Sequence, residues 1–149
     1  MSQAAIEYSR EQARKGIMFP VMGICRGAQM IMELQTEEGI LADTDSHNVT
    51  LPLTFTKDVH KSKLFGHAPK QMLHLLENEA ITFNAHIYSI TTAKFRDTKQ
   101  LRDNFFLIST NYDRKGIEFV STFEGNYFSP KFYLFEWKFV TRNKKMVQT

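Results

Sequence analysis

The sequence predicts an α/β fold built around a strand, a tight turn and a helix that together present one cysteine. An apolar run at 17–22 is typical of a buried strand, and the residues at 28–34 suit a helix. Between them lies Gly23-Ile24-Cys25-Arg26-Gly27. Strand, turn and helix in this order describe a nucleophile elbow, whose central side chain is exposed at the positive end of the helix. We therefore expect 18–22 to form a central parallel strand, and 26–34 a helix packed on one face of the sheet.

Cys25, the only cysteine of the chain, is the candidate nucleophile. The thiolate is the reactive form of cysteine, and a helix N-terminus favours it. The two flanking glycines are expected because a Cβ at either position would crowd the strand or the helix. A lone buried cysteine can also be an inert apolar residue, and this alternative stays open.

The other elements follow from local patterns. Residues 3–15 suit a helix with Gly16 as its C-cap, and Pro69 precedes a short helix at 70–76. Residues 43–46 resemble a loop, and 97–103 a polar helix or turn. The predicted strands are an edge strand at 49–55 that contains Pro52, an extended segment at 81–90, a hairpin of 105–110 with 117–122, and an aromatic strand at 132–140.

The composition limits the class of protein. A length of 149 residues and a hydrophobic fraction of 42% fit a single domain, 1–149, with a real core. A net charge of +3, from scattered basic residues, gives no case for nucleic acid. No run is long enough for a membrane span, the N-terminus does not resemble a signal peptide, and one cysteine excludes an internal disulfide. The histidines have no metal-ligand spacing, so we expect neither metal nor cofactor, and we expect His47, His60, His67 and His74 at the surface.

Several blocks follow one another along the chain: FPVMGICRGAQ at the elbow, LPLTFT followed by HKSKLF, then FNAHIYSI, ISTNYD and IEFVSTFEG. In this order they resemble the γ-glutamyl hydrolases, which are cysteine peptidases of the class I glutamine amidotransferase-like fold. The resemblance implies a flavodoxin-like sheet and hydrolysis of folyl-poly-γ-glutamate through a thioester on Cys25. It implies that the Arg26 N–H donates to the oxyanion and that His86 lines the substrate site. It also implies a lysosomal, vacuolar or extracellular location.

The chain departs from the family pattern where the general base is expected. The family has a histidine in a Trp-His-Pro-Glu block after the Glu-Gly that matches Glu124-Gly125. That position is Ser129 or Lys138 here, depending on the alignment. The family's N-terminal half, which includes a loop that completes the oxyanion hole, is also unmatched. We therefore expect a truncated member with poor activity and an open sheet edge, which would lead to a homodimer, a complex with a missing partner or poor solubility.

Two other classes of function remain open. One is a different class I amidotransferase-like enzyme, and the other is a non-catalytic remnant or binding module. Asn48-Val49-Thr50 matches the N-glycosylation sequon, which has meaning only in the secretory pathway.

Overall fold

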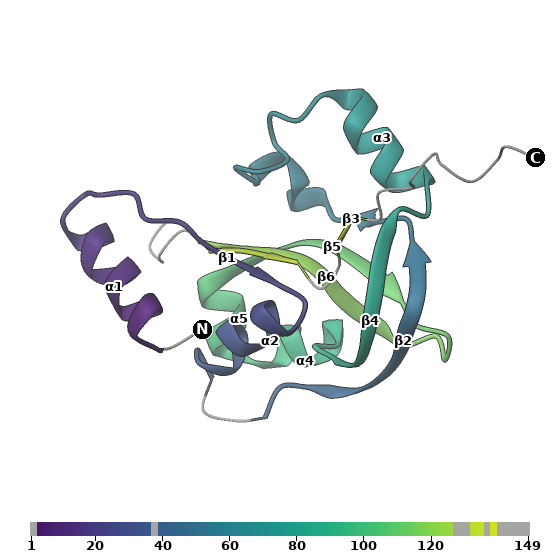
Figure 1. Cartoon of the computed structure of the whole chain (residues 1–149), viewed down its shortest axis with the longest axis horizontal. Coiled ribbons are helices and arrows are strands. Elements are labelled where there is room, and N and C mark those ends of the chain that lie inside the picture. The colour runs from purple at the N-terminus through teal and green to yellow at the C-terminus, as the bar shows by residue number, and fades with distance from the viewer. Residues whose placement is uncertain (1–2, 37–38, 127–131, 136–137, 140–149) are drawn as a thin grey trace, which may run out of the picture.

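The computed structural model describes residues 3–36, 39–126, 132–135 and 138–139, the last two segments by their backbone alone. Two sheets organise this part of the chain (Figure 1). The larger has the order β1-β7-β6-β5-β3. Its strands are β1 (Val21–Ile24), β7 (Phe132–Phe135), β6 (Glu118–Gly125), β5 (Phe105–Tyr112) and β3 (Thr54–Phe55). The smaller has the order β2-β4-β8, with β2 at Ala42–Leu51, β4 at Thr82–Ser89 and β8 at Lys138–Phe139.

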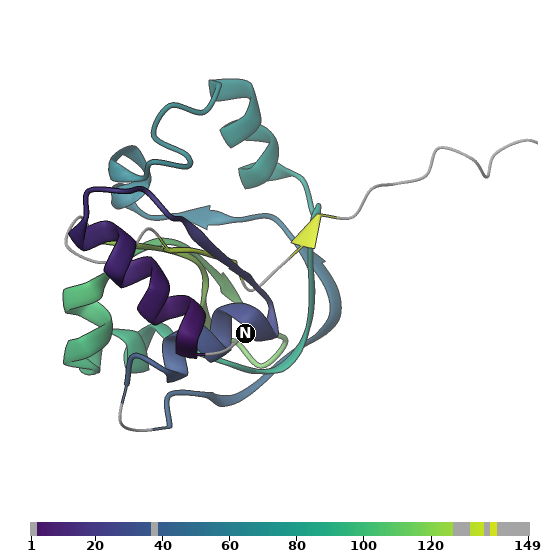
Figure 2. The same cartoon turned by 60° about the vertical axis from the view of Figure 1, so that its left-hand side comes forward.

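Helices lie on both sides of the larger sheet (Figures 1 and 2). On one side are α2 (Arg26–Glu33), α4 (Thr92–Asp97) and α5 (Lys99–Asn104). On the other are α3 (Lys70–Asn78) and the short 3-10 helix η1 (Lys57–Lys61). In the described part of the chain, no helix has the length and apolar character needed to cross a membrane.

The core is divided into two clusters by the larger sheet. The first cluster includes Ile31 and Met32 of α2, and the second includes Leu76 of α3. Strand β5 contributes to both, because successive side chains of a strand point to opposite faces. Phe105 packs in the first cluster and Ile108 in the second. The expected α/β layering, with helices on both faces of a sheet, is therefore present.

The helix before the elbow, α1 (Gln3–Arg14), ends as the sequence predicts. Gly16 has a φ of 74°, which glycine adopts without strain. Its N–H donates to the carbonyl of Ala13, and the N–H of Ile17 donates to that of Gln12, which is the pairing of a Schellman cap. Ser9 then fixes the descending chain by donating to the carbonyl of Phe19 at 2.8 Å.

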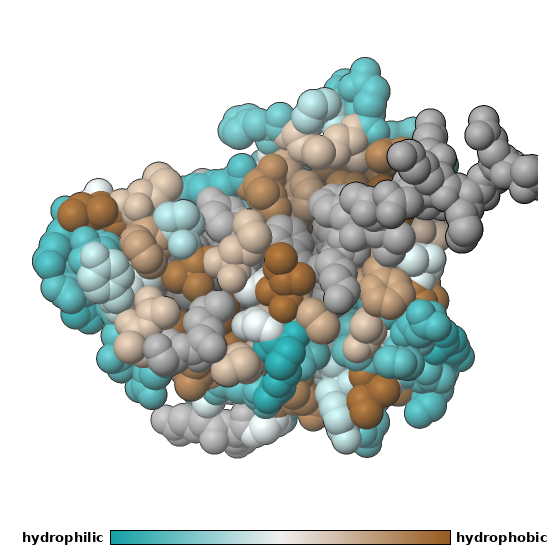
Figure 3. All heavy atoms as spheres, viewed as in Figure 1, coloured by the Kyte–Doolittle hydropathy of each residue, from teal (hydrophilic) through white to brown (hydrophobic). Residues whose placement is uncertain are grey.

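The predicted position of the elbow strand needs two corrections. The strand begins at Val21 rather than at Met18 and extends to Ile24. Strand β1 is also not central, because among the described strands its only neighbour is β7. That pair is parallel, as predicted, but the other pairs of the larger sheet are antiparallel. Met22 and Ile24 are 54% and 48% exposed, and apolar atoms reach the surface over β1 (Figure 3).

Other elements differ from prediction where pairing overrides local propensity. Residues 43–46 were expected to form a loop but belong to β2, because they lie in a long antiparallel ladder with β4. The expected strand at 49–55 is divided between β2 and β3, around Pro52. The expected strand at 132–140 becomes β7 and β8, which lie in different sheets. Helix α4 was not predicted, whereas α3, β4, α5 and the β5–β6 hairpin were.

Candidate functional site

Cys25 occupies a strained turn between β1 and α2. Its φ of 53° and ψ of −122° are unusual for any residue other than glycine. Such a conformation costs on the order of 1–3 kcal/mol and persists only where the surroundings impose it. Here the Cys25 carbonyl accepts the N–H groups of Ala28 and Gln29, at 2.9 and 3.2 Å, which begins α2 directly after the turn. This is the backbone geometry of a nucleophile elbow.

The thiol of Cys25 is partly exposed and forms no disulfide. It makes no hydrogen bond with any residue that the structure describes. A cysteine nucleophile is usually activated by a neighbouring base. The described residues therefore present the thiol at a helix N-terminus without a base bonded to it.

The glycines around the turn do not both have the predicted role. Gly23 is buried within β1. A Cβ added at Gly27, however, would meet no heavy atom within 4 Å in the described part. The expected crowding at the second glycine is therefore wrong, because α2 leaves open space beside its second residue.

Arg26 has its backbone N–H at the start of α2 and its guanidinium in contact with other residues of the helix. As the first residue of α2, it has an N–H without an intrahelical acceptor, which is what an oxyanion donor requires. Its guanidinium extends along α2 toward the C-terminal end of the helix. There Nη1 is 3.1 Å from Glu33 Oε2 and donates to Gln29 Oε1 at 3.3 Å.

Helix α2 is joined to the strand that carries His86. The buried Gln29 donates from Nε2 to the carbonyl of Tyr88 at 2.8 Å. Tyr88 lies on β4, two residues beyond His86. The first turn of the elbow helix and the end of β4 are therefore in direct contact.

His86 is buried, with 6% of its surface exposed, and both ring nitrogens are engaged. Nε2 lies 3.1 Å from Asn84 Oδ1, and Nδ1 lies 2.8 Å from Ser89 Oγ. The Asn84 amide donates to the carbonyl of Thr82, so its oxygen faces the ring, and the direction of the two ring hydrogen bonds depends on the tautomer of His86. The ring also packs edge-on against Phe119, at 5.4 Å between centroids.

Burial lowers the pKa of His86 to about 4, and a hydrogen bond with the backbone of Tyr88 offsets this only in part. The imidazole is therefore neutral near pH 7. The structure does not bring it into hydrogen-bond contact with Cys25. The other histidines are exposed, as predicted: His47, His60, His67 and His74. In the described ranges, no group of histidine, cysteine and acidic side chains could hold a metal ion.

The structure joins two sequence blocks that were quoted only for their resemblance. Ser62 of HKSKLF donates to Glu124 Oε2 at 2.7 Å, and the Lys63 N–H donates to the same carboxylate at 3.0 Å. Ser62 Oγ also accepts the N–H groups of Leu64 and Phe65. Sequence reasoning missed this buried contact, because nothing local relates residues about 60 positions apart.

Of the two candidate positions for the general base, the structure describes the backbone of only one. Ser129 lies outside the described residues. Lys138 begins β8, three residues beyond Phe135, and the backbone of Phe135 pairs with Ile24 of β1. Because β1 and β7 are parallel, both chains leave the sheet at the edge where Cys25 lies. Which of the two positions is equivalent to the family's base stays a prediction.

Fold and site together define an α/β protein with a cysteine on a nucleophile elbow. No protein-family model matches the chain. It is 35% identical to mouse γ-glutamyl hydrolase over 135 residues, covering 86% of this chain and 42% of the relative. Human γ-glutamyl hydrolase is 37% identical over 110 residues (74% and 34%), and that of soybean is 27% identical over 136 residues (85% and 40%).

Over the segment that it shares with these relatives, the chain is similar to the γ-glutamyl hydrolases. It spans about two fifths of the length of the mouse, rat and soybean proteins.

Proposed function

We propose that this chain carries the nucleophile of a γ-glutamyl hydrolase site on a class I glutamine amidotransferase-like, flavodoxin-like domain. The observation that carries the proposal is the backbone of Cys25, with φ 53° and ψ −122° between β1 and α2. The relatives named γ-glutamyl hydrolase support the reaction class. A folyl-poly-γ-glutamate is the proposed substrate, and a lysosomal, vacuolar or extracellular compartment is the proposed location.

The proposed reaction has two stages. In the first, Cys25 Sγ bonds to the γ-carbonyl carbon while the carbon–nitrogen bond breaks, and the leaving amine takes up a proton. The Arg26 N–H donates to the oxyanion that forms on the way. In the second, water attacks the thioester, which releases the γ-carboxylate and returns the thiol. His86 would contribute to the substrate site from β4, which Gln29 holds against the elbow helix.

The proposed chemistry is slow because no residue in the described part of the chain is a base bonded to the thiol. Such a group normally protonates the leaving amine and activates water, and this is worth about 10²–10⁴-fold. One oxyanion donor is worth about 10²–10³-fold. Losses within a coupled site are not additive, so we expect turnover at least about three orders of magnitude below that of a complete enzyme.

An activated substrate tests whether Cys25 acts as a nucleophile even where no general base assists it. The leaving group of γ-glutamyl-p-nitroanilide needs little protonation, so acylation of Cys25 remains possible while hydrolysis of the thioester stays slow. We expect a burst of at most one p-nitroaniline per chain, a matching mass increase on Cys25, and neither in Cys25→Ala.

The natural substrate then tests turnover. Glutamate release from a poly-γ-glutamyl folate should be barely above that of the Cys25→Ala control. Rapid release that depends on Cys25 would refute the expectation that the site lacks a general base. The variant His86→Gln would then show whether His86 acts as that base. Absence of any Cys25-dependent acylation would refute the proposed function and favour a non-catalytic protein.

A further inference from the structure

Strand β2 contains an extra residue, Asn48, that has no partner on β4. His47 pairs with Ala85 and Val49 with Asn84, so Asn48 forms a bulge between them. Its φ is 55°, a left-handed conformation that asparagine tolerates better than most residues. A bulge turns the side chain of its extra residue away from the regular ladder.

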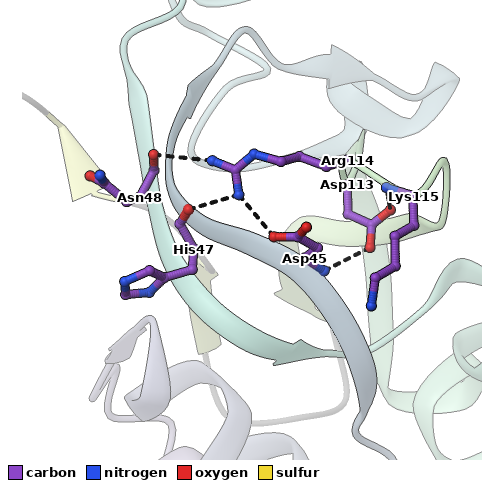
Figure 4. Close-up of polar contacts among 6 residues, drawn as sticks. All are labelled: Asp45, His47, Asn48, Asp113, Arg114 and Lys115. Atoms are coloured by element: carbon purple, nitrogen blue, oxygen red, sulfur yellow. Dashed lines mark hydrogen bonds and ion pairs between the residues drawn. The ribbon is translucent and has the colours of Figure 1, made fainter.

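The contacts that hold this bulge are made to its backbone carbonyls and not to the side chain of Asn48 (Figure 4). Arg114, in the β5–β6 hairpin, donates from Nη1 to the carbonyl of His47 at 2.9 Å and from Nη2 to that of Asn48 at 3.4 Å. It also donates to Asp45 Oδ1 at 2.8 Å. The side chain of Asn48 is exposed and points away from this cluster (Figure 4).

The amide of Asn48 differs from the other asparagine amides that the structure describes. Each of those donates to a backbone carbonyl, which fixes its orientation: Asn78, Asn84, Asn104, Asn111 and Asn126. The Asn48 amide makes no hydrogen bond within the described part of the chain. A substituent on its nitrogen would therefore disrupt no contact of the fold.

Asn48 is also the only asparagine in the whole sequence that is followed two positions later by serine or threonine, here Thr50. We propose that Asn48 is the acceptor of an N-linked glycan, an inference that rests on the secretory location proposed above. Asn48 Nδ2 bonds to the first sugar of an oligosaccharide carried on a lipid diphosphate. The sugar–phosphate bond breaks, the lipid diphosphate leaves, and the amide loses one proton.

The position of Asn48 gives such a glycan a physical role. Among the described strands, β2 is an outer strand of the smaller sheet, and Asp113 and Arg114 cover its free edge only from Asp45 to the bulge. Open edges pair with other chains unless something blocks the approach. A glycan at the bulge would extend this cover to the rest of the edge and oppose self-association there.

Four chains expressed behind a cleavable secretory leader in eukaryotic cells test the proposal: wild type, Asn48→Asp, Thr50→Val and Thr50→Ser. The aspartate keeps the left-handed backbone accessible, and valine keeps the shape of threonine. We expect one glycan on wild type and on Thr50→Ser, and none on the other two, by intact mass. Peptide-N-glycosidase should remove it from the folded protein without denaturant, because the amide is exposed.

A wild-type chain secreted without a glycan would overturn the proposal, as would a glycan that survives in Asn48→Asp. Release only after denaturation would overturn the exposed placement of the amide. Intact mass does not depend on turnover, so the p-nitroaniline burst measured on the same samples distinguishes failure of this proposal from failure of the proposed function. Asn48→Asp should retain the Cys25-dependent burst of wild type.

Discussion

Acidification should destabilise the protein through His86. The imidazole is buried and neutral in the folded state, with a pKa of about 4, against 6.5 for an unperturbed histidine. Because the folded-state pKa is lowered, the unfolded chain binds the proton first as the pH falls. The contribution of neutral His86 is fully present above pH 6.5 and is lost between that value and about pH 4.

The size of this loss follows from the two pKa values. At 1.36 kcal/mol per pH unit, the difference corresponds to roughly 3 kcal/mol over the whole range, of which about 2 kcal/mol is lost by about pH 5. This is a large share of the stability of an ordinary domain, which is about 5–15 kcal/mol.

Urea unfolding at constant ionic strength, from about pH 7.5 to about pH 4.5, measures the effect. His86→Gln cannot titrate, so its stability should change less with pH than that of wild type, although it is less stable near pH 7. His47→Gln replaces an exposed histidine on the neighbouring strand and should keep the wild-type pH dependence. Equal pH dependence in wild type and His86→Gln would refute the reasoning.

Three further outcomes can be measured, the first two by urea unfolding and the third by sedimentation. Cys25→Gly should be more stable than Cys25→Ala by about 1 kcal/mol, because glycine relieves the positive φ; equal midpoints would mean that the turn is unstrained. Asp113→Asn should cost about 1–3 kcal/mol near pH 7, since the carboxylate accepts three backbone N–H groups. Burial raises the pKa of Asp113, but these bonds lower it further. The loss should therefore disappear as the pH falls through the lowered folded pKa, and a constant difference in acid would contradict this. Self-association through the open β1 edge should raise the weight-average mass with concentration in sedimentation, and Met22→Lys should weaken it; a wild-type monomer at all concentrations would exclude it.

The sequence predicted what depends on neighbouring residues. The Gly16 cap, the helix after Pro69 and the β5–β6 hairpin each follow from a short pattern of residues, and all three are present. The turn at Cys25 was predicted for the same reason, since a strand and a helix with one residue between them leave the backbone few conformations.

What the sequence did not predict depends on distant pairing. Residues 43–46 have loop composition but gain a ladder from β4, and this outweighs their weak strand propensity. The contact of Ser62 with Glu124 joins segments that no periodicity relates. The roles of Cys25, Arg26 and His86 in a reaction remain predictions, because a reactive arrangement depends on the substrate as well as on the fold.

The pairing of β1 with β7 also has a consequence for the order of folding. Strand β1 finds its only described partner more than a hundred positions later in the chain. Contacts between such distant segments form slowly, because a long loop must close first. During synthesis, the segment that bears Cys25 therefore waits until Phe132–Phe135 has left the ribosome. The β5–β6 hairpin joins segments that are close in sequence and can form earlier, so the turn at Cys25 takes shape after it and stays exposed to chaperones and proteases until then.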